Sequence, residues 1–225
     1  MRLHLSFRTF GLIGLILALG LMQPVSTPSC SAQEKGAAAA PQGSTVDVTP
    51  PKGTLDAITA IMTRRSIRNY TQHPVPEDLI KILVEAGMCA PSAFNERSQE
   101  FIVINDRKIL DAIYNLNPKA LQIKRASVAI MVCGNQGKEK FKGQGYWQLD
   151  GSVSSENILI VANAMGLGAV WTAIYPYPDR IAAVKKLLNL PEQVIPLNII
   201  PVGYPAEQKA KENRFDPSRL HQNRW

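Results

Sequence analysis

The 225-residue sequence contains few of the residues that build metal and nucleophile sites. It has three histidines and three cysteines, and His4, His73 and His221 lie far apart along the chain. A histidine-rich metal site therefore cannot be assembled locally. The sequence has no CxxC motif, no GxSxG elbow and no Cys–His pair at local spacing, which excludes the local signatures of redox and hydrolytic nucleophile sites.

Phosphate-binding loops and stacking platforms are also missing. The sequence lacks the GxxxxGK[ST] loop, and the pair Gly166 and Gly168 follows a helical pattern instead of the strand that a dinucleotide loop requires. Aromatic residues make up 7% of the chain and are sparse near the basic residues, so no nucleic-acid partner is expected. If the protein is an enzyme, a bound cofactor is expected to hold the reactive atoms.

The first part of the chain has the pattern of an export signal. Residues 10–22 form an apolar run broken only by glycines, after a start that carries Arg2 and Arg8. About thirteen residues are short for a bilayer span, so we expect a signal peptide over residues 1–32, cleaved after Ala32, and an exported protein. Two alternatives stay open: a lipid-modified Cys30, which alone would give a membrane contact, and folded export through a near twin-arginine pattern. Residues 33–53 read as a linker.

The net charge and the cysteine content give only partial information about the binding partners of the protein. The formal net charge is +7, and loss of Arg2 and Arg8 leaves +7 − 2 = +5. A moderately basic chain suits an anionic cofactor as well as nucleic acid or an anionic membrane surface. Only Cys89 and Cys133 follow the leader, and Cys133 ends an apolar run that predicts burial.

The remaining sequence alternates short strands with helices. Apolar periodicity predicts helices over residues 55–64, 77–89, 108–116, 146–165 and 179–190, with Thr54 as the cap of the first. Strands are predicted over residues 101–104, 127–132, 169–175 and 197–202. This order indicates a mixed α/β or α+β domain. The tail from Lys209 is polar and basic but carries Phe215, Leu220 and Trp225, so we expect it to wrap across another subunit.

Five residues, Arg64-Arg65-Ser66-Ile67-Arg68, form the densest basic cluster. Guanidinium groups donate paired hydrogen bonds and keep their charge, which suits a phosphate dianion. The alternative is a solvated basic patch that interacts with the C-terminal end of a helix dipole. The cluster alone does not decide between the two.

Further motifs follow the cluster in order: APSAFN at residues 90–95, GLGAVWTAIYP at 166–176, VGYPAE at 202–207 and an arginine in the tail. Together with RRSIR and Tyr70 they resemble the FMN-dependent nitroreductase family. The resemblance covers residues 54–225. It implies an α+β fold with a central, mostly antiparallel sheet flanked by helices, and a homodimer that exchanges C-terminal extensions and holds FMN at its interface.

The resemblance also implies roles for individual residues. The family's contacts to the phosphate and ribityl groups of FMN correspond to Arg64, Arg65, Ser66 and Arg68. From the tail, Arg214 and, as a weaker candidate, Lys211 are expected to contact the same phosphate. Pro91, Ser92 and Ala93 match a loop that reaches the flavin from the second subunit. Asn95 matches an amide that hydrogen-bonds to the edge of the flavin ring, which suits an amide because it can both donate and accept. Thr172, Ala173 and Ile174 match a strand whose backbone N–H groups face flavin N5 and O4.

Some of these residues have simpler interpretations. Asn95 could hold a turn, Ser92 could cap the next segment, and Trp171 and Tyr175 could be core residues. The sequence also departs from the family at residues 95–101, where Arg97 stands in place of a glutamine and puts a positive charge near the flavin or substrate.

The implied activity is ping-pong transfer of hydride and electrons from NAD(P)H through FMN to a nitroaromatic, quinone or similar small acceptor. No side-chain acid or base is predicted, since solvent supplies protons in the family. Three alternatives remain: an exported flavoprotein reduced by a membrane or protein donor, a flavin-binding module without turnover, and a basic surface that binds nucleic acid or lipid.

Overall fold

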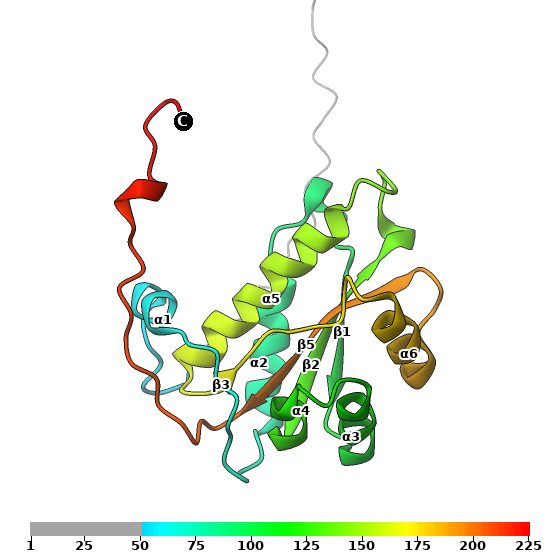
Figure 1. The fold of residues 1–225 in the computed structure, drawn as a ribbon, viewed down its shortest axis with the longest axis horizontal. Helices are drawn as coiled ribbons and strands as arrows, with labels where there is room; N and C mark the ends of the chain where they lie inside the picture. The colour runs from blue at the N-terminus through cyan, green and yellow to red at the C-terminus, as the bar shows by residue number, and fades with distance from the viewer. Residues whose placement is uncertain (1–50) are drawn as a thin grey trace, which may run out of the picture. The chain divides into compact units, whose positions relative to one another are not determined.

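A five-stranded antiparallel sheet organises the fold of the computed structural model, which describes residues 51–225. The predicted leader and nearly all of the predicted linker lie outside the described residues. The strands are β1 (Gln99–Ile104), β2 (Val128–Asn135), β3 (Gly168–Ala169), β4 (Thr172–Ala173) and β5 (Val194–Gly203). They run in the order β1-β2-β5-β3, and β4 also pairs with β5 (Figure 1). Every pairing is antiparallel, so the predicted α+β class with an antiparallel sheet is confirmed.

Helices cover both faces of this sheet. The α-helices are α1 (Ala57–Thr63), α2 (Glu77–Met88), α3 (Arg107–Leu116), α4 (Leu121–Arg125), α5 (Tyr146–Ala164) and α6 (Pro178–Leu188). Short 3₁₀ turns are η1 (Ala93–Asn95), η2 (Gln136–Lys138) and η3 (Pro217–Arg219). The long helix α5 packs beside α1 and α2, while α3 and α6 lie together elsewhere on the sheet (Figure 1). No helix within residues 51–225 combines the length and the apolar character that a bilayer crossing needs.

Two local predictions differ from the structure, and one short helix was missed. The cap of α1 is Asp56, whose carboxylate accepts from the N–H of Thr59 at 3.0 Å, whereas the Thr54 hydroxyl donates to the carbonyl of Pro51. The predicted strand over residues 169–175 is broken into β3 and β4, which pair with different parts of β5. The helix α4 was not predicted, since its five residues are too few to show a helical period.

The central strand β2 divides the core. Ile130 and Val132 belong to a cluster with α2 and α5, while Met131 and Cys133 belong to a second cluster with α3 and α6. This alternation is the two-residue period of a strand buried on both faces, as its apolar sequence predicted. Burial raises the pKa of the Cys133 thiol to about 12, with a further contribution from the charge of Glu100.

The basic segment runs alongside β3. Ser66 forms a parallel bridge with Ala169, and the N–H of Ile67 donates to the carbonyl of Ala169 at 3.1 Å. A Cβ at Gly168 would lie 2.6 Å from Cγ2 of Ile67, so this close approach requires glycine. The cluster RRSIR is thereby brought next to the segment that leads into Thr172.

One predicted apolar face is not buried in the single chain. On α1, Ile58 is 73% exposed, and Ile61 and Met62 are also exposed, while Ala60 alone is buried. In the tail, Phe215 is 71% exposed. The chain by itself therefore leaves a row of apolar side chains on α1 and another in the tail open to solvent.

Candidate functional site

A basic cavity lies between the end of α1 and the C-terminal tail. Its volume is about 750 Å³. Four of the predicted phosphate-contacting residues line it, Arg64 and Arg65 from one side and Lys211 and Arg214 from the other, 146 residues or more away in sequence. The remaining lining residues are Ile61, Met62, Glu212, Asn213 and Phe215. The two ends of the domain thus contribute cations to one hollow.

Within residues 51–225, not all hydrogen-bond donors of these cations have a partner, so the cavity can still bind an anion. Arg64 contacts Glu156 of α5 at 3.0 Å, and Arg214 contacts Glu212 at 3.0 Å. Arg65 donates from Nε to the carbonyl of Ala210 at 3.1 Å, but its Nη2 is buried without a partner. A buried guanidinium N–H group without an acceptor is costly, and the oxygens of an anionic group would satisfy it. The donor set therefore fits a phosphate.

The first part of the tail is fastened to the basic segment by Glu207. Its carboxylate accepts from the backbone N–H of Arg68 at 2.6 Å and from the side-chain amide of Asn69 at 2.9 Å. The N–H of Arg68 holds the pKa of Glu207 below its usual value despite some opposing desolvation, with the Asn69 amide and the charge of Lys209 adding to the effect. Lys209 in turn donates to the carbonyl of Ser66 at 2.6 Å. These bonds set the position from which residues 211–214 continue into the cavity.

The loop around η1 is held in a strained shape. Phe94, Asn95 and Arg97 have φ angles of 53°, 57° and 50°, in the left-handed region that residues with side chains rarely adopt. The N–H of Ala93 donates to Asp150 of α5 at 2.9 Å, and the hydroxyl of Ser98 donates to the second oxygen of the same carboxylate at 3.2 Å. Asp150 is buried, and it clamps the loop on both sides of its strained residues.

Two loop residues also carry local bonds. The Ser92 hydroxyl oxygen accepts from the backbone N–H of Arg97 at 2.9 Å, and the side-chain oxygen Oδ1 of Asn95 accepts from Nε of Arg97 at 3.2 Å. These bonds fit the turn that the sequence left open for Asn95, whereas the Ser92 side chain makes no capping bond to the 3₁₀ turn that follows it. The Asn95 amide nitrogen and the Ser92 hydroxyl hydrogen take no part in these two bonds. Pro91 contributes its carbonyl, which accepts from the side chain of Gln99 at 3.4 Å.

The predicted flavin-facing strand needs one correction. The N–H of Ile174 donates to the carbonyl of Leu197 at 3.1 Å, and the Ile174 side chain is 3% exposed within the core. Its N–H is used by the sheet and cannot face a ligand, so that part of the prediction is wrong. Thr172 and Ala173 form β4, which pairs with β5.

Sequence reasoning missed Gln122 of α4, whose side-chain amide donates to the hydroxyl oxygen of Thr172 at 3.0 Å. This contact brings α4 beside the predicted flavin-facing strand. The only sequence signal was a polar residue in a segment too short to read as a helix.

The sequence and this arrangement match those of a known protein family. The family model described as "Nitroreductase family" matches residues 61–148 and 124–204, which is more than half of the chain. The chain belongs to the nitroreductase family.

Its relatives in this family extend over nearly all of the described domain. A protein of Methanothermobacter thermautotrophicus, named as a candidate NADH dehydrogenase/NAD(P)H nitroreductase, is 46% identical over 171 residues, which are 76% of this chain and 88% of the relative. A crystal structure with the same name from Parabacteroides distasonis is 44% identical with a TM-score of 0.71, covering 75% of this chain and 98% of the other. A nitroreductase of Desulfovibrio desulfuricans, solved in complex with FMN, is 26% identical with a TM-score of 0.65, covering 76% and 98%.

Not every predicted phosphate residue of this chain reaches the cavity. Ser66 is occupied by its bridge to β3, and its carbonyl accepts from Nη1 of Arg68 at 3.5 Å. Neither Ser66 nor Arg68 is among the residues that line the cavity. They adjoin it in sequence, and Arg68 supports it through the bond of its backbone to Glu207.

Within one chain, the basic cavity and the η1 loop are separated by most of the length of α5. Asn163 near the end of α5 donates to the carbonyl of Ala60 at 2.9 Å, whereas Asp150 near its start holds Ala93. These anchor points are thirteen residues apart, which is about 20 Å along a helix axis. Figure 1 shows α1 and the η1 loop at opposite ends of α5. The predicted residues of the basic cavity and those of the η1 loop therefore form two separate half-sites.

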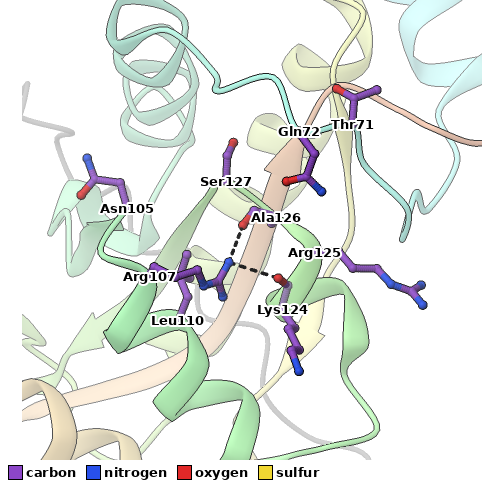
Figure 2. A pocket seen from close by; sticks show the side chains of 9 residues that line it. All are labelled: Thr71, Gln72, Asn105, Arg107, Leu110, Lys124, Arg125, Ala126 and Ser127. Atoms are coloured by element: carbon purple, nitrogen blue, oxygen red, sulfur yellow. Dashed lines mark hydrogen bonds between the residues drawn. The ribbon is translucent and has the colours of Figure 1, made fainter.

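A second cavity, of about 250 Å³, is also lined by cations but lacks the features of a ligand site (Figure 2). Arg107 donates to the carbonyls of Ile123, Lys124 and Ala126 at the end of α4 and pairs with Asp111 at 3.0 Å. The side chains of Lys124 and Arg125 point away from its centre in Figure 2. The Arg107 guanidinium is therefore used to cap the carbonyl groups at the C-terminal end of α4. Among residues 51–225, no group of three His, Cys, Asp or Glu side chains could hold a metal ion.

Proposed function

We propose that this chain is an FMN-dependent NAD(P)H oxidoreductase that acts as a homodimer with FMN at the subunit interface. The observation that carries the proposal is the convergence of Arg64, Arg65, Lys211 and Arg214 on one cavity, with Nη2 of Arg65 buried and unpaired. Membership of the nitroreductase family supports it. Names of relatives, which include NAD(P)H nitroreductase and a complex with FMN, point to the same cofactors.

In this proposal the chain's own residues bind and orient the cofactor. Arg65, Lys211 and Arg214 bind the phosphate, and Arg64 adds charge from its pair with Glu156. In the antiparallel pairing of β4 with β5, alternate N–H groups point toward β5, so the N–H of Ala173, and not that of Thr172, would be available to the ring. When bound, FMN would supply the redox chemistry between a dihydronicotinamide and the electron acceptor. Solvent provides protons, and no side-chain acid or base is invoked.

A second copy of the chain completes each site in this proposal. The loop of residues 91–95 lies about 20 Å along α5 from the anchor of α1, so one chain does not bring both half-sites together. In a dimer, the loop of one subunit can approach the basic cavity of the other. The exposed apolar residues of α1 and the tail, including Ile58, Met62 and Phe215, would then be buried between subunits.

The proposed reaction is ping-pong, with a nitroaromatic, a quinone or a similar small molecule as the electron acceptor. The test uses the purified full chain. A yellow protein with an oxidised flavin spectrum, a dimer mass by light scattering, and rapid anaerobic bleaching by NADH or NADPH are expected. A colourless protein that takes up no FMN on titration would refute the proposal.

A second candidate follows from the apolar run of residues 10–22, which favours export. In an exported protein the reductant would be a membrane or protein electron donor, because NAD(P)H is available in the cytoplasm, where most members of the family act. The same anaerobic cuvette separates the two candidates. A flavin that dithionite bleaches and neither NADH nor NADPH bleaches supports this second candidate.

A further inference from the structure

Two loops at the start of α5 present an aromatic cluster to solvent. Phe94 of the η1 loop is 63% exposed although it occupies a strained, left-handed backbone position with φ 53° and ψ 19°. Its ring centroid lies 4.7 Å from that of Phe141 and 5.8 Å from that of Tyr146, with the second pair edge to face. Phe141 is 37% exposed. A bulky side chain in such a backbone conformation is held there at a cost, which suggests a use for the exposed ring.

Three exposed cations that form no salt bridge within the described residues surround this cluster. Arg97, Lys140 and Lys142 are exposed, and within residues 51–225 none of them forms a salt bridge. The nitrogen of Lys140 lies 5.6 Å from the centre of the Phe141 ring. We call the six residues Phe94, Arg97, Lys140, Phe141, Lys142 and Tyr146 the aromatic-cationic surface.

The nearby acidic side chains already accept hydrogen bonds from the loops or pair with another cation. Glu96 accepts from the backbone N–H of Lys140 at 3.0 Å, which ties the two loops together. Glu139 is buried and accepts from the N–H of Trp147 at 2.8 Å, and Glu100 pairs with Lys138 at 2.7 Å. These carboxylates keep their negative charge, but they are less exposed than Arg97, Lys140 and Lys142, so the charged groups that a molecule meets beside the exposed rings are mainly cations.

The aromatic-cationic surface is continuous with the proposed flavin site. Asn95 follows Phe94 directly, and Arg97 donates from Nε to the Asn95 side chain at 3.2 Å. A molecule that reaches the flavin beside Asn95 would pass over the exposed rings and cations. Planar rings stack on Phe and Tyr, and anionic groups on the same molecule pair with Lys and Arg.

We propose that the aromatic-cationic surface is a subsite for an aromatic ring that carries negative charge, and that it selects anionic over neutral reaction partners. This inference rests on the proposed function. Two sources share the chemistry: the adenosine diphosphate half of a dinucleotide reductant, and an acceptor that bears a carboxylate. In a ping-pong reaction the two visit the enzyme in turn, so one subsite can serve both.

The experiment measures partner discrimination in the FMN-loaded full chain and in the variant Lys140→Gln/Lys142→Gln. Lys108→Gln/Lys186→Gln, on α3 and α6, is the matched control, since it removes the same charge elsewhere on the surface. The reductant arm compares flavin bleaching by NADH with bleaching by neutral 1-benzyl-1,4-dihydronicotinamide. The acceptor arm uses enzyme reduced with dithionite and compares 4-nitrobenzoate with neutral 4-nitrobenzamide.

We expect the ratio of anionic to neutral second-order rate constants to fall about fivefold in at least one arm for Lys140→Gln/Lys142→Gln, and to stay unchanged in the control. The arm that responds identifies the source. Phe94→Ala should lower the rate constants of the aromatic partners in the same arm. Unchanged ratios in both arms, or an equal fall for neutral and anionic partners, would overturn the inference. Because dithionite reduces the flavin in the acceptor arm, failure of NADH as reductant would count against the proposed function alone.

Discussion

The carboxylate of Asp150 accepts a hydrogen bond from the backbone N–H of Ala93 at 2.9 Å. Asp150 belongs to α5 and Ala93 to the loop that is proposed to reach the flavin of the second subunit. The other carboxylate oxygen accepts from Ser98, beyond the three residues with positive φ. A single buried side chain therefore fixes the shape of a loop that local backbone preference alone would not produce.

Replacing Asp150 should release that loop. For Asp150→Ala we expect a loss of about 1–3 kcal/mol in the free energy of unfolding, because the Ala93 N–H and the Ser98 hydroxyl lose their acceptor. FMN affinity should fall as well. Urea unfolding and fluorescence titration measure both quantities. Asp150→Asn keeps an oxygen for Ala93 and should recover most of the affinity; an Asp150→Ala protein as stable as the parent would show that the clamp is unimportant.

The basic cavity should discriminate between FMN and riboflavin. Arg65→Ala with Arg214→Ala removes two cavity cations, and we expect FMN affinity to fall about 10- to 100-fold, given about 1.5–3 kcal/mol for a hydrogen bond to a charged group. Riboflavin affinity should change little, because riboflavin has no phosphate. Arg219→Ala, in η3 and outside the cavity lining, is the control. Equal losses for both flavins would place the phosphate elsewhere.

The tail should determine the oligomeric state. A chain that ends before Arg214 lacks Phe215, Leu220 and Trp225, which are exposed in the single chain. We expect it to yield monomers without flavin, as measured by light scattering and absorbance. The full-length Arg214→Ala protein separates the contribution of charge from that of the tail, since it should remain dimeric. A yellow, stable monomer from the shortened chain would contradict tail exchange.

The attachment of the tail should weaken at acid pH. The N–H of Arg68 lowers the pKa of Glu207 in the folded chain relative to its ordinary value of 4.5. A lowered pKa stabilises the fold above the unfolded-state pKa, and that stabilisation is lost as pH falls through the folded-state pKa. The difference in unfolding free energy between the parent and Glu207→Gln should be full near about pH 6 and shrink below about pH 4.5. A difference independent of pH would show that the carboxylate charge is not involved.

The two cysteines of the domain should differ in reactivity. Cys133 is buried and its pKa is raised to about 12, so almost none of it is thiolate at neutral pH. Cys89 is exposed at the end of α2. Alkylation followed by peptide mapping should modify Cys89 within minutes and leave Cys133 unmodified until the chain unfolds. Modification of both at equal rates in the folded protein would contradict the burial.

The sequence predicted the fold well where the hydrophobic period is long. The helices α2, α3, α5 and α6 and the strand β2 follow from their apolar patterns. The break between β3 and β4 was not visible, because the apolar run of residues 169–175 continues through it and the register with β5 decides where it pairs.

The candidate site was predictable in composition but less so in geometry. The order of the motifs predicted that Arg65 and Arg214 lie together, and both line one cavity. The bond of the Ile174 N–H to Leu197 and the contact of Gln122 with Thr172 depend on tertiary pairing between distant segments. Local residue patterns carry no signal for either.

The separation of the two half-sites along α5 has a genetic consequence. In the proposed dimer, a chain with Arg65→Ala would have a damaged phosphate half and a chain with an Asn95 substitution a damaged loop half, so each homodimer would carry two defective sites. A mixed dimer of the two chains concentrates both lesions in one site and leaves the other intact. Two inactive alleles would then complement each other when expressed together, with up to half the activity of the parent in every mixed dimer.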